Sequence, residues 1–164
     1  MRKIFNSVES LKNWCDSRNE NIVLTSGGFD PMHVGHLRCL QESSTIAAGL
    51  PNGRLAVVVN GDGFLLRKKG YAFMPEAERA EIIAGVAGVD YVVLWDDGSQ
   101  FVSGAVEKLK PIFFTKGGDR SSSENVPEFE ICERIGCKVL FGIGGGKIQS
   151  SSVLVSNISN TGKS

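Results

Sequence analysis

The stretch GGFDPMHVGH (residues 27–36) joins an expected strand to an expected helix. It follows the apolar run NIVLT (residues 21–25) and leads into GHLRCLQESSTIAAG (residues 35–49), whose apolar spacing is typical of a helix. A glycine turn between a buried strand and a helix brings backbone N–H groups and the positive end of a helix dipole to one point. The stretch therefore predicts an anion site, at which Gly27 and Gly28 let a ligand approach the backbone closely.

Strand-like and helix-like segments alternate along the rest of the chain. The apolar runs typical of buried strands are residues 21–25, 54–60, 90–95, 111–118 and 137–143. Alternation with helical segments implies right-handed βαβ crossovers and a mostly parallel sheet. We therefore expect a single α/β domain over residues 1–160, Rossmann-like and three-layered, with a mostly parallel five-stranded sheet. We also expect an N-terminal helix at residues 7–18 packed on this domain and a tail at residues 161–164.

Composition narrows the classes of partner. The 164 residues are 41% hydrophobic and 22% charged, and 18 basic residues balance 18 acidic ones, which does not favour a nucleic-acid surface. No apolar run approaches the roughly 20 residues of a membrane helix, and no signal peptide is visible. Because no CxxC pair occurs, we expect free thiols at Cys15, Cys39, Cys132 and Cys137 and a reducing, cytoplasmic location.

The two histidines of the chain, His33 and His36, both lie in the opening stretch. If the helix begins near Val34, their spacing of three residues directs both imidazoles toward the same anion, to which they can donate hydrogen bonds. One alternative is a pair of ordinary buried histidines. Another is a zinc site, but zinc would need a third ligand that no cysteine or further histidine supplies, so we expect no metal-ligating residue.

Four glycine-rich segments follow four different expected strands: SGGFDPMHVGH, NGDG, KGGDR and GIGGGK. Because the carboxyl ends of parallel strands share one edge of the sheet, these segments should gather there around a ligand. GIGGGK does not satisfy the P-loop pattern, since Lys147 is followed by Ile148.

Five motifs together resemble one enzyme family. GGFDPMHVGH is similar to the (T/N)GxFDxxHxGH signature of the cytidylyltransferase-like nucleotidyltransferases. VVVNGDGFLLRKKG, MPEAERAEIIAGVAGVDYVVLW, KPIFFTKGGDR and KIQSSSVLV resemble further motifs of that family, in its order and spacing, over about residues 22–158. The pattern is most similar to the heptose-1-phosphate adenylyltransferases, with the glycerol-3-phosphate cytidylyltransferases as the alternative.

The resemblance implies a reaction in which the phosphate of a sugar phosphate or polyol phosphate attacks the α-phosphorus of ATP or CTP and releases pyrophosphate. No side chain acts as a covalent nucleophile in this family, so positioning and charge stabilisation would carry catalysis. Mg²⁺ is expected with the nucleotide, held mainly by phosphates and water. A homodimer is also expected from the resemblance.

The resemblance assigns roles to residues of this chain. The catalytic set is His33, His36 and Lys69. The nucleotide-binding set is Gly27, Gly28, Phe29, Asp30, Gly35, Gly118, Asp119, Ser150, Ser151 and Ser152. The acceptor-binding set is Asp62, Arg79, Lys116 and Arg120.

Local chemistry offers simpler interpretations for several of these residues. Lys69 lies in a charged run that could be solvated, Asp62 and Asp119 could form turns, and the serines could act only as a helix N-cap. Arg79 could pair with Glu76 on a helix surface.

The sequence disfavours two other classes of protein. A non-catalytic nucleotide-binding module is disfavoured because His33, His36 and Lys69 are all present. An aminoacyl-tRNA synthetase also carries a similar histidine turn, but this chain is short for one and KIQSSS is not its second motif.

Overall fold

The computed structural model describes residues 3–118, 127–146 and 148–161. Its single sheet has six strands in the order β1-β4-β3-β2-β5-β6, and every neighbouring pair runs parallel. The strands are β1 (Ile4–Phe5), β2 (Asn21–Gly27), β3 (Gly53–Asn60), β4 (Tyr91–Trp95), β5 (Phe113–Gly117) and β6 (Lys138–Ile143). The predicted α/β class and parallel sheet are confirmed, but the predicted count of five strands is wrong. The two-residue strand β1, which pairs with β4, is too short to leave a periodic signal in the sequence.

Side chains of the central strands are buried on both faces of the sheet. In β3, Ala56 and Val58 belong to one apolar cluster, while Leu55, Val57 and Val59 belong to the other. This follows from the alternation of side chains along a strand, and it explains why β3 is a nearly continuous apolar run in the sequence.

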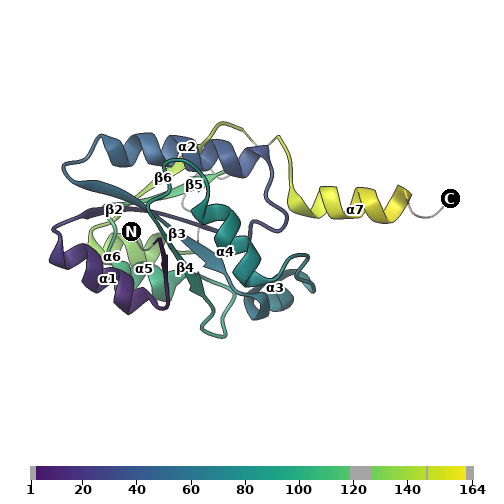
Figure 1. The fold of residues 1–164 in the computed structure, drawn as a ribbon, viewed down its shortest axis with the longest axis horizontal. Coiled ribbons are helices and arrows are strands. Elements are labelled where there is room, and N and C mark those ends of the chain that lie inside the picture. Colours follow the sequence, from purple (N-terminus) through teal and green to yellow (C-terminus); the bar gives the residue numbers. More distant parts are fainter. Residues whose placement is uncertain (1–2, 119–126, 147, 162–164) are drawn as a thin grey trace.

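Helices cover the two faces of the sheet and make the three-layered sandwich seen in Figure 1. Helices α1 (Val8–Ser17), α5 (Ser103–Leu109) and α6 (Phe129–Ile135) pack on one face. Helices α2 (Val34–Ala48) and α4 (Glu76–Ala84) pack on the other. Since β2 lies between β3 and β5, with α2 and α5 on opposite faces, the strand order reverses at β2 and opens a crevice at its carboxyl end.

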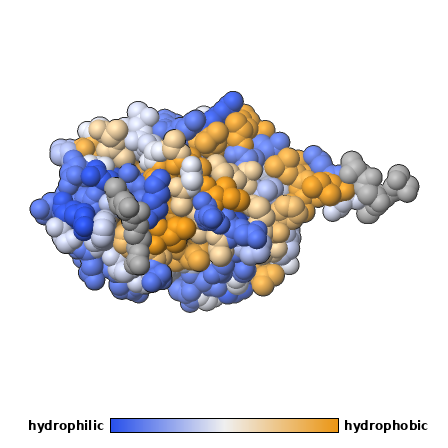
Figure 2. Space-filling view, viewed as in Figure 1, coloured by the Kyte–Doolittle hydropathy of each residue, from blue (hydrophilic) through white to orange (hydrophobic). Residues whose placement is uncertain are grey.

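Two further helices lie near this crevice. Helix α3 (Asp62–Lys69) follows β3 after one residue, where the sequence pattern indicates a glycine turn and not a helix. Helix α7 (Ser151–Thr161) extends away from the sandwich in Figure 1, and Figure 2 shows apolar side chains at the surface around it, where Val153 and Ile158 are exposed.

All four cysteines are free thiols, as expected. Within the described ranges, none of the helices has the length and apolar character needed to pass through a bilayer.

Candidate active site

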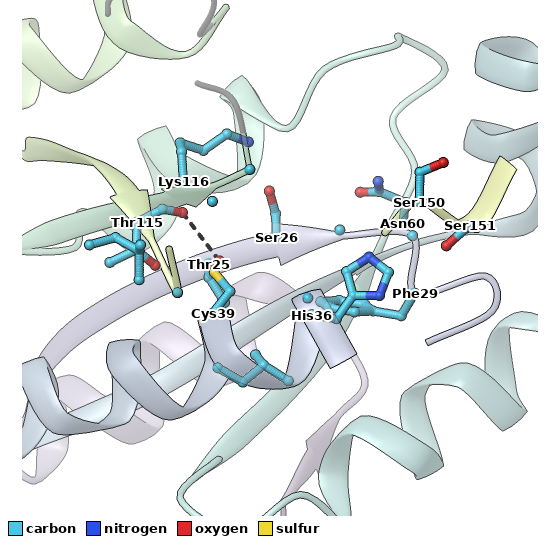
Figure 3. A pocket seen from close by; sticks show the side chains of 18 of the residues that line it. Thr25, Ser26, Phe29, His36, Cys39, Asn60, Thr115, Lys116, Ser150 and Ser151 are labelled. Atoms are coloured by element: carbon cyan, nitrogen blue, oxygen red, sulfur yellow. Dashed lines mark hydrogen bonds between the residues drawn. The ribbon is translucent and has the colours of Figure 1, made fainter. Parts of the chain in front are cut away.

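A cavity of about 540 Å³ occupies the crevice at the carboxyl edge of the sheet (Figure 3). This is an ordinary size for a small-molecule site. The strands contribute their last residues to its wall: Thr25, Ser26 and Gly27 from β2, Asn60 from β3, Thr115, Lys116 and Gly117 from β5, and Ile143 from β6. The glycine-rich segments therefore meet at one edge, as the strand pattern predicted.

At the start of helix α2, the two histidines are joined by a hydrogen bond and by stacking of their rings. His33 is the N-cap residue, and its Nδ1 accepts a hydrogen bond from the Gly35 N–H at 3.1 Å. The His33 N–H in turn donates to His36 Nδ1 at 3.1 Å, and the two rings stack with centroids 3.8 Å apart. Because both Nδ1 atoms accept hydrogen bonds, the proton of each neutral ring is carried on Nε2. Both residues line the cavity, and Figure 3 shows the His36 ring directed toward Asn60 and Ser150.

His36 is held in its neutral form. Burial is the main cause that lowers the pKa of its imidazole to about 4, and the neighbouring His33 and Lys69 contribute to the same shift. At neutral pH, His36 therefore presents an Nε2–H donor without a full positive charge. Such a donor can bind a phosphate oxygen and gain strength as negative charge develops on it.

The depressed pKa of His36 predicts a loss of stability in mild acid. The unfolded imidazole titrates near pH 6.5 and the folded one near pH 4. Between these values only the unfolded chain takes up the proton, so the free energy of unfolding should fall as pH drops from 6.5 to 4, by up to roughly 3 kcal/mol. Urea denaturation across this pH range, compared between the wild type and His36→Asn, measures the contribution. Equal pH slopes for the two proteins would contradict the assignment.

Asp30 organises the segment between α3 and α4 rather than the cavity wall. Its carboxylate is buried and accepts hydrogen bonds from the N–H groups of Phe73 and Met74, each at 2.6 Å. Lys69 Nζ lies 3.3 Å from Asp30 Oδ2 and donates to the Asp30 carbonyl at 3.0 Å. Neither Asp30 nor Lys69 lines the cavity, whereas Lys68 does. The roles predicted for Asp30 in nucleotide binding and for Lys69 in catalysis therefore stay predictions.

Arg79 is a buried structural residue. Its guanidinium is fully buried and donates to the carbonyls of Met74 (2.8 Å), Gly28 (2.9 Å) and Asn60 (2.5 Å), and to the Asp62 carboxylate at 2.8 Å. Neither Arg79 nor Asp62 lines the cavity, and their predicted role in binding the acceptor stays a prediction. The alternative pairing of Arg79 with Glu76 is not observed either, because Glu76 Oε1 accepts from the Asp62 N–H.

The serines open helix α7 at the edge of the cavity. Ser150 Oγ accepts from the Val153 N–H at 3.1 Å, and Ser151 Oγ donates to the Pro31 carbonyl at 2.6 Å. The second bond ties the start of α7 to the turn that precedes the histidines. Ser150 and Ser151 line the cavity, as Figure 3 shows, but Ser152 is exposed and does not.

The remaining predicted residues divide between the cavity and the undescribed positions. Gly27, Gly28, Phe29, Gly35, Lys116 and Gly118 line the cavity. Asp119 and Arg120 lie outside the described residues.

Sequence reasoning missed a second group of lining residues, which includes Thr25, Ser26, Cys39, Asn60, Phe64, Lys68, Gln100, Phe101 and Glu128. Asn60 and Lys68 lie within a quoted motif, but their residue types gave no sign of a role. Glu128 carries no motif signal.

Gly35→Ala should weaken nucleotide binding with little change in stability. A Cβ at this position would lie 2.9 Å from His33 Cε1 and 3.0 Å from its Nδ1, so the imidazole must move. Losing one aligned donor to a charged group costs about 1.5–3 kcal/mol, which predicts at least a ~10-fold rise in the Kd for the nucleoside triphosphate that the sequence leads us to expect. The higher helix propensity of alanine offsets the damaged N-cap to within about 1 kcal/mol. Isothermal calorimetry measures the binding and urea denaturation the stability.

Gly49→Ala, at the other end of α2, is the matched control for Gly35→Ala, because its Cβ would meet two carbonyl oxygens at 3.4 and 3.9 Å, close to ordinary contact distances. Equal ATP affinities for the two variants would show that the position of the His33 ring does not matter for binding.

The protein is a doubly wound α/β protein whose cavity lies at the carboxyl end of its central strand, beside a helix N-terminus, the place where such sheets bind ligands and where an anion is favoured. The Cytidylyltransferase-like family model matches residues 24–136, and the chain belongs to this family. The class predicted from the sequence, a nucleotidyltransferase, is thereby confirmed.

Curated relatives and a solved structure agree with this membership. The chain is 36% identical over 125 residues to the bifunctional protein HldE of Geobacter metallireducens, and 39% identical over 125 residues to that of Citrifermentans bemidjiense. Each match covers 75% of this chain but only 24% of the relative, so the match spans about a quarter of the length of these proteins. The crystal structure of the lipopolysaccharide core biosynthesis protein from Thermoplasma volcanium GSS1 has a TM-score of 0.59 and 26% identity, covering 79% of this chain and 97% of that one.

Proposed function

We propose that the protein transfers a nucleoside monophosphate from a nucleoside triphosphate to a sugar phosphate or polyol phosphate and releases pyrophosphate, as a D-glycero-D-manno-heptose-1-phosphate adenylyltransferase does. The observation that carries this proposal is the interlocked pair of His33 and His36 at the N-terminus of α2, whose Nδ1 atoms both accept backbone hydrogen bonds. The similarity to HldE proteins supports the heptose acceptor and ATP.

The reaction forms one bond and breaks one. An oxygen of the acceptor phosphate attacks the α-phosphorus, the bond from that phosphorus to the bridging oxygen breaks, and pyrophosphate leaves with the bonding electrons. In this proposal the Nε2–H groups of His33 and His36 bind the oxygens on which charge increases. The Gly28 backbone permits close approach of the phosphates, and the N-terminus of α7 at Ser150 and Ser151 binds the outer ones.

Mg²⁺ would accompany the triphosphate and neutralise part of its charge. Among the residues described, no three His, Cys, Asp or Glu side chains gather where they could hold a metal ion. That Mg²⁺ comes with the nucleotide and is held mainly by phosphates and water stays a prediction. Homodimerisation also stays a prediction.

Pyrophosphate release tests the proposal. ATP and CTP are each combined with heptose 1-phosphate and with glycerol 3-phosphate in the presence of Mg²⁺. We expect release with ATP and heptose 1-phosphate; release with CTP and glycerol 3-phosphate would favour the other group of the family instead. No release from any pair, together with detectable ATP binding, would reject both acceptors, and no ATP binding would reject the proposed reaction.

A further inference from the structure

The cavity extends from the histidines to the opposite face of the sheet. Its far wall is built by the residues that precede helices α5 and α6, namely Gln100, Phe101, Val102, Pro127 and Glu128, and by Phe64 and Lys68 of α3. None of these residues belongs to the predicted catalytic, nucleotide or acceptor sets. The sequence therefore predicts no ligand group for this wall.

Glu128 leaves one buried oxygen unused in this wall. Its side chain is only 4% exposed, and its Oε1 accepts a hydrogen bond from the Val102 N–H at 3.1 Å. Within the described part of the chain, Glu128 Oε2 has no hydrogen-bond partner although the atom is buried. A buried carboxylate oxygen without a hydrogen-bond partner lowers the stability of the fold. In native proteins such an atom is commonly explained by a bound ligand or water molecule.

Asn60 lines the same cavity and also has a buried side-chain oxygen, Oδ1, without a hydrogen-bond partner among the described residues. It ends strand β3 and is 5% exposed. Figure 3 shows its amide directed toward the cavity between Ser26 and Ser150. Trp95 Nε1 is also buried without a partner in the described part of the chain, but Trp95 does not line the cavity.

Glu128 Oε2 and Asn60 Oδ1 are both hydrogen-bond acceptors, so a ligand that binds them must carry hydrogen-bond donors. The substrates of the proposed reaction, a sugar phosphate or polyol phosphate and a nucleotide, carry such donors as hydroxyl groups. Hydroxyl groups donate without a charge, and the apolar side chains of Phe64, Phe101 and Val102 suit the C–H faces of a sugar.

We propose that Glu128 and Asn60 bind sugar hydroxyl groups of the substrate, and that Glu128 determines specificity for a polyhydroxylated ligand over a hydroxyl-free phosphate. This inference rests on the proposed function and adds the chemistry by which the sugar is chosen. The hydroxyls can come from the acceptor or from the ribose of the nucleotide, so the test has one arm for each.

Glu128→Gln is the discriminating variant. It keeps a carbonyl oxygen for the Val102 N–H, but it puts an NH₂ donor where the unpartnered oxygen stands. Glu130→Gln is the matched control, since Glu130 is exposed two residues further along the chain. Urea denaturation checks that both variants remain folded.

The measurement is calorimetric binding, which needs no turnover. The acceptor arm compares heptose 1-phosphate with propyl phosphate in the presence of Mg²⁺ and α,β-methylene-ATP, which cannot transfer its nucleotide. The ribose arm compares ATP with 2′-deoxy-ATP and 3′-deoxy-ATP. We expect Glu128→Gln to weaken binding of the hydroxylated ligand at least 10-fold in one arm, and to leave its hydroxyl-free or deoxy counterpart within twofold of the wild type.

Two outcomes would overturn the inference, and a third would overturn the function beneath it. Equal affinities of the wild type and Glu128→Gln for both ATP and heptose 1-phosphate would remove Glu128 from recognition. An equal loss for the hydroxylated ligand and its counterpart would show that Glu128 only supports the shape of the wall. Absence of ATP binding by the wild type would reject the proposed reaction itself.

Discussion

His36→Ala is expected to lower kcat for pyrophosphate release by at least ~10²-fold, the usual worth of one donor to developing charge in a preorganised site. The reason is the geometry of the pair. The Nδ1 of His36 is occupied by the His33 N–H, so Nε2–H is the group available to the substrate. The pKa of about 4, lowered chiefly by burial, keeps this imidazole neutral at the pH of the assay. Steady-state kinetics with saturating nucleotide and acceptor measure the effect.

The control for His36→Ala separates chemistry from helix capping. Alanine also leaves the His33 N–H without its partner, which can cost about 1 kcal/mol of stability. In His36→Asn, a side-chain oxygen can take the place of Nδ1 and keep this cap, but no group reaches the position of Nε2. The two variants should therefore be equally slow, while His36→Asn is the more stable in urea. Near-native turnover by a folded His36→Asn would remove His36 from catalysis.

The part of the site that sequence could predict is the part that depends on local chain geometry. The turn at residues 27–36, the start of α2 at Val34 and the meeting of the strand ends all follow from short-range periodicity and the handedness of βαβ units. His33 and His36 could be placed at a helix N-terminus for the same reason.

The remainder depends on contacts between residues far apart in the chain. Arg79 gave the local signal of a helix-surface residue, yet it meets Gly28 and Asn60, which are 51 and 19 positions away. Asp30 similarly accepts from the N–H groups of Phe73 and Met74. Neither pairing produces a periodic pattern in the sequence that could predict it. Glu128 lies at the cavity because the start of α6 is next to the start of α5, where the Val102 N–H donates to its carboxylate.

Arg79→Met is expected to reduce the free energy of unfolding by about 3–5 kcal/mol, because three backbone carbonyls lose hydrogen bonds from a charged donor. Methionine fills a similar volume but donates no hydrogen bond. The carbonyls of Gly28, Asn60 and Met74 would lose their guanidinium donors, each at a cost of about 1–3 kcal/mol less any relaxation or water that replaces the donor. Urea denaturation monitored by tryptophan fluorescence measures the loss.

Arg134→Met is the matched control, because Arg134 is exposed and pairs with Glu107 on the protein surface at 2.8 Å. A surface pair of this kind contributes about 0–1 kcal/mol, so the control should unfold near the wild-type midpoint.

Arg79 also joins the last carbonyl of β3, at Asn60, to that of Gly28 just beyond β2, and both residues line the cavity. Arg79→Met should consequently weaken ATP binding even at temperatures where it is folded. Equal stability of Arg79→Met and Arg134→Met, together with normal ATP binding, would contradict this role of Arg79. The pairing of the strands in the sheet would then be enough to position the ends of β2 and β3.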